Sequence, residues 1–382
     1  MEDSVYKLRV LWINASSSWG GAEISSLTMV RSLVDLGFDC RLCAPPGSYV
    51  DLRCQEYGIE CPPIDIPTLK TNPITTLRSI CRFIQSTRAL CQSIRPDVIV
   101  GHGERTHVYL ATLRLTGTLI PQLWCPVQHW QIFRVIYRLI GWVPQRFVVG
   151  SNSVRRFYSI PKTVVIPVPF ELPVSLGSLN GRLNEKPMGT FVVGIFARLN
   201  RVKGIHVLIK AVARLRLENL PVHLLVFGER SSIDPRYADE LEMMVEAGGL
   251  RECVTFRGFT SEVIDAMRQC DVIVSCSLPR FGGPESFGRT VVEAWVAGVP
   301  VIATAVGGPA ESVEHGRNGI LVPAEDPIAL AQSIQLLIEN RELASRIANG
   351  GRESLPKYDS HHVAKLFGDA LADCVHKGFG DL

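Results

Sequence analysis

The sequence predicts an α/β protein built from two doubly wound, Rossmann-like domains. Three observations favour this class. The chain has 382 residues, more than one hydrophobic core usually supports. Short strand-like runs alternate with helical patterns from end to end, which is typical of parallel sheets covered by helices. Hydrophobic residues make up 46% of the chain and charged residues 20%, so there is enough apolar surface for two cores.

Twelve apolar runs, each bounded by polar or turn-forming residues, predict the strands of these two domains. In the first half they lie at 8–14, 38–44, 96–101, 122–128, 146–150 and 163–168. In the second half they lie at 190–196, 222–228, 253–258, 271–276, 299–305 and 319–323.

The domain boundaries follow from a segment that lacks any hydrophobic period. Residues 169–189 are rich in Pro, Gly, Ser and Asn and predict a linker between domains at 1–168 and 190–360. Residues 361–382 are expected to form a C-terminal helix and tail, for which packing back on the first domain is one option. Ligands of open α/β sheets bind beyond the carboxyl ends of the strands, so we expect a ligand in the cleft between the two domains.

The absence of a recognisable targeting signal and the spacing of the cysteines predict a cytoplasmic location. The opening MEDSVYKLRVLWIN lacks the order of a signal peptide, and no run of about 18 apolar residues occurs. Eleven cysteines are scattered along the chain, which predicts reduced thiols rather than a disulfide framework. Cys40 and Cys43 form C-x-x-C within a predicted strand, where they would point to opposite faces and could not share a zinc ion.

Charge is distributed unevenly between the two halves. Residues 1–180 carry a net charge of +6 and the remainder −3, and no Asp or Glu occurs between Arg105 and Phe170. Within that stretch, residues 129–147 interleave arginines with aromatic residues. Two interpretations stay open: a core-packed helix with a basic rim, or a helix on an anionic membrane surface at the cytoplasmic face. Nucleic acid is not an expected partner, because the second half is acidic and no recognised binding module occurs.

Two glutamates in PESFGRTVVEAWVAGVP, Glu285 and Glu293, stand eight positions apart. Ser286 is a predicted N-cap and Gly298 a predicted helix end. Free backbone amides at such a helix start favour binding of a phosphate. Eight residues at helical rise span roughly 12 Å, which is comparable to the distance from the ribose of a nucleotide to a sugar carried on its second phosphate. The competing interpretation is that Glu285 favours the helix dipole and Glu293 pairs with Arg289.

A second candidate is the pair of cations Arg198 and Lys203, in the loop that follows the predicted strand at 190–196. A departing diphosphate gathers negative charge, which two cations beyond a strand end would stabilise. Solvated basic residues on a loop are the alternative. No D-x-D carboxylate pair follows a strand, so a metal-independent site with these cations in the metal's place fits the sequence.

Two further candidates lie in the first half. Gly20 and Gly21 follow the first predicted strand and would let backbone amides approach a phosphate, although a tight turn without a ligand explains them equally well. His129 follows the predicted strand at 122–128, where a histidine can face the cleft as an acid or base, or be structural.

Together these motifs resemble the retaining glycosyltransferases of family four, which have the GT-B fold of two Rossmann-like domains facing across a cleft. The resemblance runs from WGGAE to about residue 340 and is most specific in GIFARLNRVKG, VTFRGF and the segment from CDVIVSC to AEDP. It implies an enzyme that transfers a sugar from a nucleotide diphosphate sugar to a glycan or lipid-linked acceptor with retention of anomeric configuration. It implies no cofactor, the donor being a UDP-, GDP- or ADP-sugar.

The resemblance also implies roles for individual residues. Glu285 and the backbone of Phe287, Gly288 and Arg289 would hold the donor sugar and phosphates. Glu293 would bind the ribose. Arg198 and Lys203 would neutralise the departing diphosphate. Gly20 and Gly21 would line the diphosphate, and His129 would lie beside the reacting sugar.

The chain departs from the family at two places. IPVPFE at 166–171 replaces a common Asn-Gly-Val-Asp turn, and Arg289 stands where small or aliphatic residues are common. Arg289 would either add a phosphate contact or pair with Glu293. Two other functions remain open at this level: a sugar-nucleotide epimerase of the same fold and a non-catalytic binding homologue. The donor base and sugar, the acceptor, the linkage and the oligomeric state do not follow from the sequence.

Overall fold

The computed structural model divides the chain into two compact units. Unit 1 comprises Met1–Glu171 with Lys357–Leu382, and unit 2 comprises Leu172–Pro356. The structure describes residues 8–14, 20–64, 73–103, 106, 110, 118–123, 146–158, 162–173, 189–279 and 285–376.

Unit 1 is built on a six-stranded parallel sheet with the order β2-β1-β3-β4-β5-β6. Its strands are β1 (Arg9–Asn14), β2 (Asp39–Cys43), β3 (Val98–His102), β4 (Thr118–Leu123), β5 (Phe147–Val149) and β6 (Thr163–Val165). β1 and β3 are buried almost throughout, as expected for parallel strands that helices cover on both faces.

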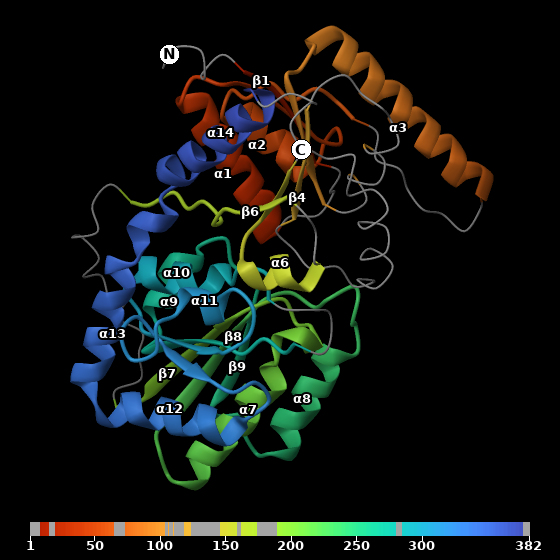
Figure 1. Cartoon of the computed structure of the whole chain (residues 1–382). Helices are drawn as coiled ribbons and strands as arrows, with labels where there is room; N and C mark the ends of the chain where they lie inside the picture. The colour runs from red at the N-terminus through yellow and green to blue at the C-terminus, as the bar shows by residue number, and fades with distance from the viewer. Residues whose placement is uncertain are drawn as a thin grey trace. The chain divides into compact units, whose positions relative to one another are not determined.

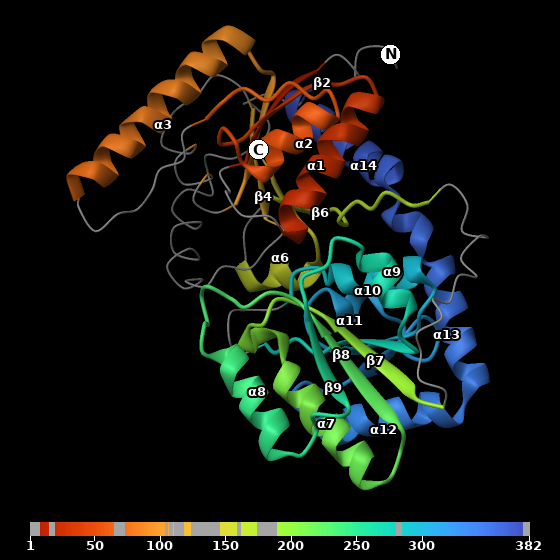
Figure 2. The same ribbon diagram turned by 180° about the vertical axis from the view of Figure 1, so that it is seen from behind.

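The described helices of unit 1 lie between these strands in the sequence, except for the last one at the C-terminal end. They are α1 (Gly21–Asp35), α2 (Tyr49–Glu56), α3 (Pro73–Ile94), α6 (Asn152–Tyr158) and α14 (Ser360–His376). Figures 1 and 2 show α14 beside α1, although the two helices stand at opposite ends of the sequence. On α14, Phe367 lies 5.5 Å from the ring of Trp12, and Gly368 lies close against Phe38. The chain therefore returns to unit 1 at its C-terminal end.

Unit 2 contains a second six-stranded parallel sheet, with the order β12-β11-β10-β7-β8-β9. Its strands are β7 (Phe191–Phe196), β8 (Val222–Phe227), β9 (Val254–Gly258), β10 (Val272–Ser275), β11 (Val301–Thr304) and β12 (Ile320–Val322). The switch in strand order lies between β7 and β10, where doubly wound sheets bind their ligands.

Helices cover this sheet, and short helical turns follow several of its strands. They are η3 (Arg201–Lys203), α7 (Ile205–Leu217), α8 (Tyr237–Ala247), α9 (Val263–Arg268), α10 (Arg289–Ala297), α11 (Pro309–Ser312), α12 (Pro327–Glu339), α13 (Arg341–Glu353) and η4 (Leu355–Tyr358), the last of which crosses the boundary between the units. Buried side chains of α7, α8 and α12, such as Leu208, Leu241 and Leu330, form one core with the strands.

The twelve predicted strands are confirmed as elements, and one of them is displaced. The strand predicted at 122–128 is β4, which runs from Thr118 to Leu123 and so begins earlier than expected, and residues 124–128 lie outside the described residues. Pro121 lies within it, opposite Gly101 of β3. Proline donates no ladder hydrogen bond and normally argues against a strand interior.

The cysteines of the described residues are all free thiols. Cys43 packs in the core of unit 1, whereas Cys40 lies outside that cluster, and both are buried. Burial raises the pKa of the Cys40 thiol to about 12. Within the described ranges, no group of three or more His, Cys, Asp or Glu residues is arranged to hold a metal ion.

Candidate functional site

The polar centre of unit 2 is formed by Glu285, Lys203 and Ser277. Lys203 Nζ donates to Glu285 Oε2 at 2.5 Å, and Ser277 Oγ donates to the same oxygen at 2.8 Å. Side-chain exposure is 18% for Glu285 and 31% for Lys203, so both reach solvent from a largely covered position. Burial works to raise the pKa of Glu285, but the Lys203 ammonium and the Ser277 hydroxyl outweigh it and hold this pKa below its ordinary value. The carboxylate is therefore ionised at neutral pH.

A short loop after β7 places Lys203. Asn200 caps η3 by accepting a hydrogen bond from Val202 N at 3.1 Å. Leu278 N donates to Val202 O at 2.7 Å and ties the loop to the segment after β10. Gly204 follows with a φ of 65°, and a Cβ at this position would lie 2.0 Å from Cys276 O. The loop can lie this close to β10 only because residue 204 is a glycine.

Glu285 is held by the turn after β11. Gly308 N donates to Glu285 O at 2.7 Å. Gly307 has a φ of 64°, and a Cβ there would lie 2.0 Å from Glu285 O. Glu285 therefore takes its place from a backbone contact between two strand-end loops, which fixes its carboxylate in front of Lys203.

Helix α10 begins later than the sequence predicted. The expected N-cap was Ser286, but the helix runs from Arg289 to Ala297 and its N-cap is Gly288, in the left-handed conformation. Ser286 is buried, and its Oγ has no hydrogen-bond partner within the described part of the chain. Because 285–288 are not helical, the separation of the two glutamates cannot be taken from helical rise. The expected helix end at Gly298 is confirmed.

Glu293 pairs with Arg289 inside the helix. Arg289 Nε donates to Glu293 Oε1 at 3.2 Å, and the two side chains are 19% and 18% exposed. Burial lowers the pKa of the Arg289 guanidinium from its ordinary value, and Glu293 opposes this shift. The pair that the sequence offered as the alternative is thus present. This pairing weakens the prediction that Glu293 binds the ribose, which stays a prediction.

The structure gives fewer contacts for the remaining predicted site residues. Arg198 follows the end of β7; its side chain is exposed and makes no hydrogen bond or ion pair with other described residues. Phe287 is buried beside Gly308. Gly20 is the N-cap of α1 and Gly21 its first residue, without a side-chain cap. They belong to unit 1, so a shared site with the unit 2 residues remains a prediction. His129 lies outside the described residues.

Ser277 and the Gly307-Gly308 turn are the site residues that the sequence analysis missed. Each starts within three residues of the end of a strand of unit 2, β10 or β11, as the Arg198 loop follows β7. Thr304 Oγ1 at the end of β11 donates to Ser277 O at 2.8 Å and joins two of these segments. Polar or glycine residues shortly after adjacent parallel strands were the available signal.

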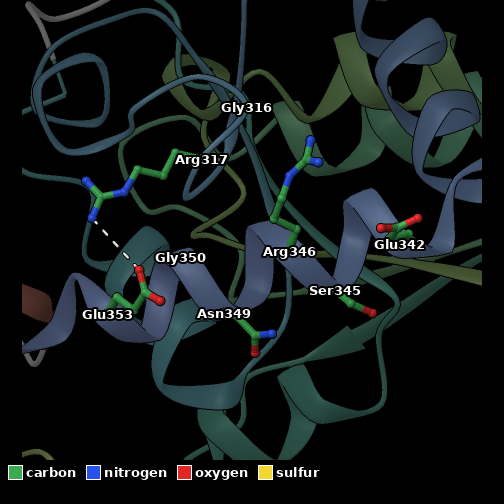
Figure 3. Close-up of a pocket in the computed structure, with 8 residues that line it drawn as sticks. All are labelled: Gly316, Arg317, Glu342, Ser345, Arg346, Asn349, Gly350 and Glu353. Carbon is green, nitrogen blue, oxygen red and sulfur yellow. Dashed lines mark ion pairs between the residues drawn. The ribbon is translucent and has the colours of Figure 1, made fainter.

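A separate concavity of unit 2 lies along α13. Figure 3 shows the eight residues that line it: Gly316, Arg317, Glu342, Ser345, Arg346, Asn349, Gly350 and Glu353. Arg317 and Glu353 approach to 3.9 Å across it, and Arg346 points away from this pair (Figure 3). Charges of both signs line it and none of the predicted site residues does, so it does not extend the candidate site.

Solved structures show which fold these two units define. The crystal structure of Anabaena Alr3699/HepE in complex with UDP and glucose matches with a TM-score of 0.79 at 22% identity, over 96% of this chain and 99% of that chain. The sucrose-phosphate synthase of Thermosynechococcus elongatus matches with a TM-score of 0.80 at 19% identity, over 97% and 100%. The predicted GT-B fold, with a Rossmann-like domain in each unit, is confirmed.

The sequence itself is related to glycosyltransferases in its second half. Residues 182–354 match the family "Glycosyl transferases group 1". The D-inositol 3-phosphate glycosyltransferase of Corynebacterium jeikeium is 32% identical over 200 residues, 51% of this chain and 45% of the relative. The alignments with such curated relatives thus span less than half of their length. Arg198, Lys203, Glu285 and Glu293 all lie within the matched segment.

Among the described helices, none combines the length and the apolar composition that crossing a membrane requires.

Proposed function

We propose that the chain is a glycosyltransferase that moves a sugar from a nucleotide diphosphate sugar to a glycan or lipid-linked acceptor. The observation that carries this proposal is the Lys203–Glu285–Ser277 cluster at the carboxyl ends of the unit 2 strands. It lies within the segment related to group 1 glycosyltransferases, and a UDP complex is known for a protein of the same fold. An ionised carboxylate beside an ammonium suits a ligand that carries both hydroxyl groups and phosphates.

In this proposal the cations act on the leaving group. As the bond from the anomeric carbon to the diphosphate oxygen breaks, negative charge grows on the diphosphate, and Lys203 lies where a fixed cation would stabilise it. The guanidinium of Arg198 on the same loop is a second cation, and this side chain is exposed to solvent. The two would supply the charge that a divalent metal ion supplies in other transferases, so the proposed reaction needs no metal or other cofactor.

Glu285 is proposed to bind the donor sugar rather than to attack it. Its Oε2 already accepts from both Lys203 and Ser277, which leaves Oε1 to accept from a sugar hydroxyl. Without a nucleophile from the protein, retention would follow if the acceptor hydroxyl oxygen attacks the anomeric carbon on the face from which the diphosphate departs. A diphosphate oxygen would then take the proton of that hydroxyl. The backbone around Phe287, Gly288 and Arg289 is proposed to hold the phosphates, and His129 with Gly20 and Gly21 to complete the site.

The acceptor class is the least constrained part of the proposal. The phosphatidyl-myo-inositol mannosyltransferase of Mycobacterium leprae is 35% identical over 164 residues, 42% of this chain and 41% of the relative. Its name and that of the D-inositol 3-phosphate enzyme favour a phosphorylated or lipid-borne polyol among the acceptors to be tried first.

Product analysis tests the reaction class. The full chain is incubated with a sugar nucleotide, with and without candidate acceptors, and the products are separated. We expect free or transferred sugar together with nucleoside diphosphate. Conversion to a different sugar nucleotide would show an epimerase instead, and an unchanged donor under conditions where it binds would show a non-catalytic homologue.

Replacing Arg289 tests how Glu293 contributes. If Arg289 orients Glu293 toward the ribose, Arg289→Leu should raise the KM for the donor about tenfold, because a misplaced carboxylate loses about one charge-assisted hydrogen bond. The kcat should change little, since the ribose does not react. Arg214→Leu is the control, because Arg214 forms an exposed pair with Glu218 at the same helical spacing. An unchanged or lower KM in Arg289→Leu would exclude the orienting role.

A further inference from the structure

Helix α3 of unit 1 presents an exposed face that the proposed reaction does not use. Its second half packs into the unit 1 core through residues such as Phe83 and Cys91. Its first turns carry Ile74 and Leu77, which are 63% and 62% exposed. Figures 1 and 2 show α3 at the outer edge of unit 1. These two large aliphatic side chains lie one turn apart and form a small exposed apolar patch.

The same face is strongly basic. No Asp or Glu occurs between Asp65 and Asp97, whereas α3 alone carries three arginines. Arg78, Arg82 and Arg88 are exposed and form no hydrogen bond or ion pair with any described residue. At 3.6 residues per turn, the exposed apolar and basic residues share one side of the helix. They are Ile74, Leu77, Arg78, Cys81, Arg82 and Arg88.

We propose that this face of α3 docks the protein on an anionic membrane surface. A lipid headgroup layer matches both of its features at once. Ile74 and Leu77 can enter the boundary between headgroups and acyl chains, while the flexible arginine side chains keep their guanidinium groups level with the lipid phosphates. An acidic protein surface would satisfy the arginines but would leave the two aliphatic side chains to be matched separately. The mixture on one face therefore favours lipid.

The inference concerns a different element from the basic stretch at 129–147, of which only residues 146 and 147 are described. It also does not depend on the proposed reaction, because the α3 face would bind lipid whether or not the chain transfers sugar. If both hold, α3 would keep the enzyme at the surface where a lipid-linked acceptor is found.

Vesicle sedimentation of the full chain tests the proposal. We expect binding to vesicles that contain phosphatidylglycerol and little binding to vesicles of phosphatidylcholine alone, with affinity falling as salt is raised. Each arginine near an anionic surface contributes about fivefold in partitioning, so R78Q/R82Q should lower it about 25-fold. I74S/L77S should also weaken binding but leave its dependence on lipid charge intact.

The matched control is R155Q/R156Q, which removes the same charge from exposed positions on α6 of the same unit. It should keep most of the wild-type binding. Equal losses in the α3 and α6 variants would overturn the proposal by showing that overall charge is responsible. Absence of wild-type binding to anionic vesicles, or equal binding to neutral ones, would also overturn it. Unchanged melting temperatures verify that the variants are folded.

Discussion

Lys203→Ala should abolish most turnover of the proposed transfer reaction while leaving the protein folded. Removing a preorganised group that stabilises developing negative charge costs about 10²–10³ in kcat. The side chain is 31% exposed, so its loss should not collapse the core. The loss should appear in kcat and in a raised KM for the donor, because Lys203 would contact the diphosphate of the bound donor and the diphosphate gains further charge as the bond breaks. Initial rates of donor consumption at saturating donor measure it.

Lys210→Ala is the control for this variant. Lys210 lies on α7, is exposed and forms no ion pair in the described part of the chain, so its removal changes the net charge equally without touching the cluster. Its kcat should match that of the wild type. Wild-type turnover in Lys203→Ala would remove Lys203 from the proposed chemistry, and Glu285 would then need another explanation for its burial beside an ammonium.

Gly307→Ala should destabilise unit 2 and displace Glu285. A methyl group at this position would lie 2.0 Å from Glu285 O and 2.7 Å from Glu285 N, so one of the two loops must move. The left-handed backbone adds about 1–2 kcal/mol for any residue with a Cβ. Together these effects should cost about 3–4 kcal/mol of unfolding free energy, within the range of severe point mutations. Denaturant unfolding measures the loss.

The matched control is Gly249→Ala. Gly249 has a φ of 62°, nearly that of Gly307, but nothing lies within 4 Å of its Cβ position. It should therefore cost only the conformational part, about 1–2 kcal/mol. Equal losses in the two variants would show that the close approach to Glu285 contributes nothing. Residual activity in folded Gly307→Ala protein then reports how far Glu285 depends on this contact.

The sequence predicted the sheets well because parallel strands covered by helices are continuous apolar runs with clear ends. It was least accurate where tertiary contacts override local preference. Ser286 has the residue type of an N-cap, yet packing against Gly307 and Gly308 keeps 285–288 out of the helix and makes Gly288 the cap. Pro121 lies inside β4 although its residue type argues against a strand.

The candidate site could be predicted as a set of positions but not as a set of contacts. Lys203 and Glu285 are 82 positions apart, and only the neighbouring strands β7 and β10 bring them together. Ser277 carries no motif of its own and becomes noticeable once the end of β10 is known. For Arg289, the sequence offered both a phosphate contact and a pair with Glu293, and only the folded helix shows that the pair forms.

Ligand-dependent thermal stabilisation tests the central claim, a nucleotide diphosphate sugar site around Lys203 and Glu285, most directly. A ligand that binds only the folded state raises the melting temperature, so uridine, guanosine and adenosine diphosphate sugars are compared on wild type and Lys203→Ala. We predict that sugars of one base stabilise the wild type and that Lys203→Ala loses most of this shift. Equal stabilisation of both proteins, or none by any donor, would contradict the site.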